Sequence, residues 1–107
     1  KKKDMVAAVD LGTKQPIKSL AARFLTYKLK SIFLPTSVEF SVSDDGKNFR
    51  TLKTVMMDQV LNDRYDCWID IATADDLIET GRYVRVFAIN GMGQWIFSDE
   101  ILVNPVY

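Results

Sequence analysis

SVEFSVSDDGKNF, residues 37–49, is the stretch that decides the fold class of this 107-residue chain. Apolar Val38, Phe40 and Val42 alternate with polar side chains, which is the period-2 pattern of a half-buried β-strand. The acidic run and Gly46 that follow are typical of a tight turn, because Asp and Asn tolerate left-handed backbone conformations and glycine adopts them freely. The stretch therefore predicts a strand that enters a hairpin.

Two adjacent aspartates, Asp44 and Asp45, form the tip of this turn. They lack the D-x-D spacing and the distant bidentate glutamate of a calcium loop. Neighbouring carboxylates on a solvated turn also have nothing to raise the pKa of one above the other, as glycoside hydrolysis requires. We therefore interpret both residues as shaping the hairpin rather than as catalytic or metal-binding groups.

Further segments with short apolar periods or β-branched and aromatic runs predict seven strands in all. Only residues 73–81 look helical, with Thr73 as a cap, acidic residues in the first turn and Gly81 as a stop. Seven strands with no long helix between them predict an all-β fold, an antiparallel sandwich of two sheets. Besides 37–43, the predicted strands are 6–12, 17–26 (entered through Pro16), 49–57, 66–72, 82–90 and 95–103.

The composition excludes several classes of function. The 14 basic and 14 acidic residues give a formal net charge of zero, so the chain lacks the positive surplus that nucleic acids and anionic membranes attract. No apolar run approaches the roughly 18 residues of a membrane span. The absence of histidine excludes histidine acid–base catalysis, Ser-His-Asp or Cys-His nucleophiles and histidine-ligated zinc. The single cysteine, Cys67, excludes an internal disulfide and is interpreted as a small buried hydrophobe.

Two predicted loops carry the side chains best suited to a ligand, since rigid sheets hold such loops in place. Aromatic side chains can stack on a sugar ring, while lysine and amide side chains hydrogen-bond its hydroxyl groups. A core role is the alternative, and for Ile32 and Phe33 we favour a hydrophobic plug beneath the first loop. Trp95 has the same alternative, because it leads directly into a predicted strand. The candidate ligand-binding residues are Tyr27, Lys28, Lys30, Asn90, Gln94 and Trp95.

Asp99 and Glu100 lie inside the last predicted strand, where carboxylates are unusual because they are seldom buried without partners. One interpretation is an exposed edge or an ion pair with Arg23, Arg82 or Arg85. The other interpretation is metal ligation. The residues alone leave both open.

Four segments together resemble the coagulation-factor type C, or discoidin, domain, which is a galactose-binding-like β-sandwich. They are VDLG (9–12), SIFLPTSVEFSVSDDGKNF (31–49), GRYVRVFAIN (81–90) and WIFSDEILV (95–103). The similarity is greatest to the copies appended to bacterial β-N-acetylhexosaminidases (chitobiases), grouped with family 32 carbohydrate-binding modules. It extends over residues 6–103 and implies a jelly-roll sandwich with ligand loops at one end. Members usually have a segment ahead of VDLG, so we expect residues 1–107 to form one domain cut from a larger secreted protein.

The resemblance also implies specific residue roles. Glu100 matches a glutamate that many members use as a structural Ca²⁺ ligand, with the carbonyl of Asp99 beside it. Sugar-binding members often place an arginine and an asparagine in the loop after the second strand, together with a histidine. This chain has Tyr27, Lys28 and Lys30 in that loop, and its last loop is shortened to NGMGQW.

The function that the resemblance implies is a non-catalytic carbohydrate-binding module of a secreted, periplasmic or cell-surface glycoside hydrolase. Its expected partners are a hexosamine or galactose-type glycan and the adjacent catalytic domain. The alternative is a structural or protein-interaction module that packs against a catalytic domain without binding sugar. We do not expect the isolated chain to be an enzyme.

Overall fold

Seven β-strands, with the β1–β2, β3–β4 and β5–β6 connections, make up most of the part of the chain that the structure describes. This computed structural model describes residues 4–26, 35–57, 68–90, 96 and 98–104. Within these ranges there is no helix that could cross a membrane. The strands are β1 (Met5–Ile17), β2 (Leu20–Thr26), β3 (Ser37–Ser43), β4 (Arg50–Met56), β5 (Trp68–Ala74), β6 (Glu79–Ile89) and β7 (Ser98–Val103).

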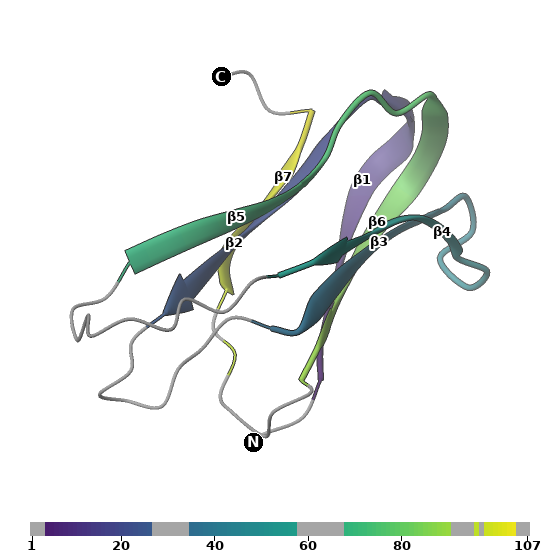
Figure 1. Ribbon diagram of the computed structural model, residues 1–107. Coiled ribbons are helices and arrows are strands. Elements are labelled where there is room, and N and C mark those ends of the chain that lie inside the picture. The colour runs from purple at the N-terminus through teal and green to yellow at the C-terminus, as the bar shows by residue number, and fades with distance from the viewer. Residues whose placement is uncertain (1–3, 27–34, 58–67, 91–95, 97, 105–107) are drawn as a thin grey trace.

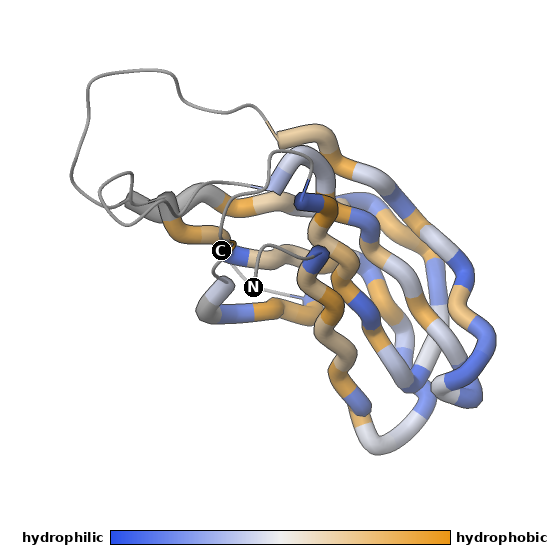
Figure 2. Tube along the Cα trace, turned by 90° about the horizontal axis from the view of Figure 1, so that it is seen from below, coloured by the Kyte–Doolittle hydropathy of each residue, from blue (hydrophilic) through white to orange (hydrophobic). Residues whose placement is uncertain are grey.

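The strands form two antiparallel sheets that lie face to face (Figure 1). One sheet has the order β1-β6-β3-β4 and the other has the order β5-β2-β7. Apolar and polar residues alternate along the strands (Figure 2), and the inward apolar residues of both sheets form one core. Phe24 on β2 and Phe40 on β3 are its largest fully buried side chains. The predicted all-β antiparallel sandwich is confirmed.

Strand β3 has the predicted bounds, and its three apolar side chains are fully buried as predicted. The expectation that its other face meets solvent is wrong. Ser41 is 1% exposed because it lies between Thr51 on β4, whose Oγ1 is 3.5 Å from the Ser41 Oγ, and Arg85 on β6. The guanidinium of Arg85 in turn lies over the ring of Phe49, 4.3 Å from its centroid. A central strand of this sheet is therefore covered on both faces.

The predicted short helix at 73–81 is wrong. Residues 73 and 74 end β5, residues 79–81 begin β6, and the connection between them turns at Asp76, which has φ of 56°. The Leu77 N–H donates a 2.8 Å hydrogen bond to the Lys18 carbonyl, and the Leu77 side chain packs against the core. Contacts with a distant segment thus override the local helix signals.

The predicted boundary at Pro16 is also wrong. Pro16 lies near the end of β1, paired with Thr80, and β2 starts only at Leu20. Strand β1 also continues beyond Gly12, where the predicted strand 6–12 ends. Its pairing with β6 shifts register between Asp10 and Gln15 and then resumes.

The register defines two ends of the sandwich, which we call the hairpin end and the loop end. At the hairpin end lie the β1–β2, β3–β4 and β5–β6 connections, and Ser43 of β3 pairs there with Tyr83 of β6. At the loop end, β2 stops and β3 starts, and Ser37 of β3 pairs with Ile89 of β6.

Candidate functional site

The predicted glycan-binding residues belong to segments that start at the loop end. One segment follows Thr26 of β2, and the other begins with Asn90 at the end of β6. The Asn90 N–H donates a 2.7 Å hydrogen bond to Oδ1 of Asp4, which ties the end of β6 to the start of β1. Asn90 therefore lies at this end, and its predicted role in binding a glycan stays a prediction. Outside the described residues lie Tyr27, Lys28, Lys30, Ile32, Phe33, Cys67, Gln94 and Trp95, so their predicted roles stay predictions.

Glu100 faces an arginine across the sheet. Arg23 on β2 and Glu100 on β7 are register partners, and Arg23 Nη1 lies 3.0 Å from Glu100 Oε2. The ion-pair interpretation of Glu100 is therefore confirmed for Arg23. Asp99 lies on β7, and its side chain is outside the description. No group of three or more Asp, Glu, Cys or His side chains among the described residues could hold a metal ion, so calcium ligation stays a prediction.

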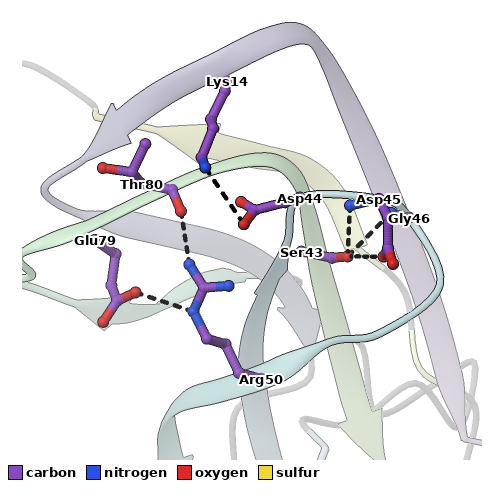
Figure 3. A network of polar contacts seen from close by, with 8 residues as sticks. All are labelled: Lys14, Ser43, Asp44, Asp45, Gly46, Arg50, Glu79 and Thr80. Atoms are coloured by element: carbon purple, nitrogen blue, oxygen red, sulfur yellow. Dashed lines mark hydrogen bonds and ion pairs between the residues drawn. The ribbon is translucent and has the colours of Figure 1, made fainter.

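The acidic turn between β3 and β4 is held by its own side chains (Figure 3). Asp45 Oδ1 accepts hydrogen bonds from the backbone N–H groups of Lys47 (2.8 Å) and Asn48 (2.9 Å). Ser43 Oγ donates to the same oxygen and accepts from the N–H of Gly46 (3.0 Å). These hydrogen bonds hold the pKa of Asp45 well below its ordinary value, and the bonds from the N–H groups of Asn48 and Lys47 contribute most. The predicted hairpin role is confirmed for Asp45.

A groove of about 1090 Å³ lies at the hairpin end, and all three connections of that end contribute to it. Its apolar lining includes Pro16 and Ile17 from the end of β1 and Leu77 and Ile78 from the β5–β6 connection. Ile78 is 96% exposed. The volume lies just above the range for small-molecule sites, which is about 300–1,000 Å³.

Ion pairs neutralise part of the charge around the groove (Figure 3). Arg50 Nε lies 3.1 Å from Glu79 Oε1, and its Nη2 donates a 2.6 Å hydrogen bond to the Thr80 carbonyl. Lys14 Nζ lies 3.5 Å from Asp44 Oδ2. Arg50 thus joins the start of β4 to the start of β6, and Lys14 of β1 lies beside the β3–β4 turn.

Three charged side chains of the groove have no ion-pair partner in the described part of the chain. They are Lys18 on the β1–β2 turn and the consecutive carboxylates Asp75 and Asp76. The unpaired charge of the groove is therefore negative. This arrangement can accept hydrogen bonds from a cationic or hydroxylated ligand.

The sequence interpretation missed this groove because its residues come from three turns far apart in the chain. The sequence does contain a signal for a strand followed by a turn at 75–78. Ala72 and Ala74 continue the period-2 pattern of a strand, and both are buried. Two aspartates directly after a strand are typical of a turn. The acidic residues were instead assigned to the first turn of a helix.

The described geometry agrees with solved structures of carbohydrate-binding modules. The chain superposes with a TM-score of 0.69 and 19% identity on chitosan-binding module 1 of a chitosanase/glucanase from Paenibacillus sp. IK-5. It superposes with a TM-score of 0.60 and 20% identity on the Clostridium perfringens module CpGH89CBM32-5, solved with GalNAc-β-1,3-galactose. It also matches the C-terminal domain of a Bacteroides fragilis chitobiase, with a TM-score of 0.58 and 15% identity. The chain has the fold of these modules.

The superpositions cover 94%, 92% and 94% of this chain and 67%, 63% and 62% of the three neighbours, in the same order. The chain thus spans about two thirds of the length of each neighbour. No protein-family model and no curated protein matches the sequence. The similarity is one of fold, and it agrees with the resemblance seen in the sequence.

Proposed function

We propose that the chain is a non-catalytic carbohydrate-binding module of a glycoside hydrolase. The observation that carries this proposal is the superposition of more than nine tenths of the chain on two binding modules of glycan-active enzymes and on the C-terminal domain of a chitobiase. One of these neighbours is described as chitosan-binding and another holds an N-acetylgalactosamine–galactose disaccharide. A hexosamine or galactose-type glycan is therefore the ligand class to test first.

The primary glycan site is proposed at the loop end. Two rigid sheets supply the strand ends from which the loop segments start, which is the arrangement that positions binding loops well. Stacking on a sugar ring is assigned to Tyr27 and Trp95. Hydrogen bonds to hydroxyl groups are assigned to Lys28, Lys30, Asn90 and Gln94.

The proposal extends to the parent protein. The module would hold an adjacent catalytic domain close to its glycan, in the secreted, periplasmic or cell-surface location where such substrates occur. A protein-docking role is the alternative, and the described surface does not favour it. Its exposed large apolar side chains, Val6, Met56, Ile71 and Ile78, come from four different elements.

Titration calorimetry with glucosamine, N-acetylglucosamine and galactose-type oligosaccharides tests the loop-end site. We expect Tyr27→Ala and Trp95→Ala each to weaken binding about tenfold, because a lost aromatic contact is worth roughly 1–2 kcal/mol. Ile71→Ala, which removes an exposed side chain from β5, is the matched control and should leave the affinity unchanged. The absence of binding to every glycan, or unchanged affinity in both aromatic variants, contradicts the proposal.

Structural calcium at Glu100 and the Asp99 carbonyl forms a separate part of the proposal. The described residues do not complete such a site, because Glu100 pairs with Arg23 and no further ligand cluster lies among them. Thermal unfolding in CaCl₂ and in EDTA tests it directly. Binding to the folded state alone must raise the unfolding midpoint, so equal midpoints rule calcium out.

A further inference from the structure

We propose that the groove at the hairpin end is a second glycan site that recognises the ammonium groups of glucosamine residues. This inference rests on the proposed carbohydrate-binding function and adds a ligand class and a location to it. It places the second site at the hairpin end, opposite the loop end where β2 stops and β6 ends.

The two carboxylates that carry the inference are unpaired, and the backbone of their turn is anchored. Asp75 and Asp76 are exposed and have no ion pair or hydrogen bond in the described part of the chain. Their backbone is held by the hydrogen bond from Leu77 N–H to the Lys18 carbonyl and by the contact of Leu77 with the core. The carboxylates therefore sit on a well-anchored turn at the rim of the groove.

The charge balance of the groove favours a cation. Its side chains comprise three cations and four carboxylates, and the Arg50–Glu79 and Lys14–Asp44 pairs remove two of each. The unpaired charges that remain are one cation, Lys18, and two carboxylates, Asp75 and Asp76. An ammonium group gains a charge-assisted hydrogen bond there, whereas a neutral acetamide gains much less and a polyanion is repelled.

The apolar part of the groove fits a pyranose ring. Ile78, two residues after Asp76, is 96% exposed, and Pro16 lies in the same lining. The C–H face of a sugar ring can pack on such aliphatic side chains while its substituents reach the rim. A volume of about 1090 Å³ leaves room for more than one ring, so an oligomer rather than a monosaccharide is the expected ligand.

The test uses a glucosamine tetramer and an N-acetylglucosamine tetramer, each titrated by calorimetry and by ¹⁵N–¹H NMR. In the wild type, the glucosamine tetramer should shift the amide signals of 75–80. The double variant Asp75→Asn, Asp76→Asn should weaken this binding about three- to tenfold and leave the affinity for the acetylated tetramer unchanged. Raising the NaCl concentration should weaken the wild-type interaction as well.

The variants are chosen so that the fold is preserved. Asp76 has a left-handed backbone, and Asn adopts that conformation as readily as Asp. Glu39→Gln, on β3 and outside the groove, is the matched loss of one carboxylate and should not change binding. Unchanged glucosamine binding in the double variant, or equal wild-type affinity for both tetramers, overturns this inference.

The two proposals fail in different ways. If Trp95→Ala abolishes all glycan binding and the aspartate variant changes none, the loop-end function stands and the groove site falls. If neither tetramer nor any galactose-type glycan binds the wild type, the carbohydrate-binding function itself falls and the groove site with it.

Discussion

Asp45 accepts hydrogen bonds at both carboxylate oxygens. Ser43 Oγ and two backbone N–H groups donate to Oδ1, and the Asn48 side chain donates to Oδ2 at 2.9 Å. The residue types of this turn were enough to predict a hairpin, because each has a local preference for it. The role of Ser43 was not predictable, since a serine at a strand end has no single preferred partner.

We expect Asp45→Asn to destabilise the fold more at neutral pH than at acidic pH. Folding lowers the pKa of Asp45 below its ordinary value of 3.8, so the unfolded chain takes up the proton first as the pH falls. The stabilisation is therefore fully present above about pH 5 and is lost as the pH falls through the folded-state pKa. Thermal unfolding at pH 7, 5 and 3 measures the difference between the two proteins.

Asp44→Asn is the control for that series. Asp44 makes only a 3.5 Å ion pair with Lys14 between two exposed side chains, which is worth little. Its effect should be smaller than that of Asp45→Asn at neutral pH. A stability difference for Asp45→Asn that stays constant from pH 7 to pH 3 contradicts the assigned role.

Gly46 combines a left-handed backbone with a close neighbour. Its φ is 79°, and a Cβ added there would lie 3.2 Å from ring atoms of Tyr83. Gly12 has a similar φ of 86° but open space around the same position. We expect Gly12→Ala to cost about 1 kcal/mol of unfolding free energy and Gly46→Ala about 2 kcal/mol, as measured by urea titration. Equal costs would show that the Tyr83 contact is irrelevant.

At the scale of elements, prediction succeeded where local pattern and tertiary pairing agree. The bounds of β3 follow from strict alternation alone. The segment at 73–81 failed because Thr73, the acidic pair and Gly81 mimic helix signals, while the decisive facts are the pairing of Ala74 with Leu20 and of Glu79 with Ile17. Such pairings between distant segments are invisible in a single sequence, and so is a groove built from three turns.

Asn104 joins β7 to the β1–β2 turn beside the groove. Its Oδ1 accepts hydrogen bonds from the N–H groups of Lys18 (2.7 Å) and Ser19 (3.2 Å), and its Nδ2 donates to the Pro16 carbonyl (3.0 Å). We expect Asn104→Gly, which retains the left-handed backbone, to cost about 1–2 kcal/mol of unfolding free energy in urea titrations.

Asn104→Asp separates the contributions of the two amide atoms. Aspartate keeps the acceptor for Lys18 and Ser19 and loses the donor to Pro16, so its cost should lie below that of Asn104→Gly. Equal costs for the two variants would mean that the acceptor bonds contribute nothing.

At the scale of the whole molecule, the two sheets share one core. No backbone ladder joins the described strands of one sheet to those of the other, so the side chains between them hold the sandwich together. We expect Phe40→Ala to cost about 3–5 kcal/mol, a large part of the 5–15 kcal/mol that stabilises an ordinary domain. Hydrogen exchange should accelerate in β2 of the opposite sheet as much as in β3.

Thr54→Ala serves as the comparison, because Thr54 is exposed on β4 and should change stability by less than about 0.5 kcal/mol. Faster exchange confined to the four-stranded sheet in Phe40→Ala would show that the two sheets unfold independently.

The long strand β1 borders the four-stranded sheet, and this has a consequence for how copies of the protein behave in solution. An edge strand of 13 residues would ordinarily template the addition of another chain. Here the ladder is broken between Asp10 and Gln15, and the Asp10 carboxylate forms an ion pair with Arg82, whose Nε lies 2.8 Å from Asp10 Oδ1. The bulge and the charged pair interrupt any continuous docking edge. We therefore expect the register shift in β1 to disfavour edge-to-edge stacking of copies of the protein into fibrils.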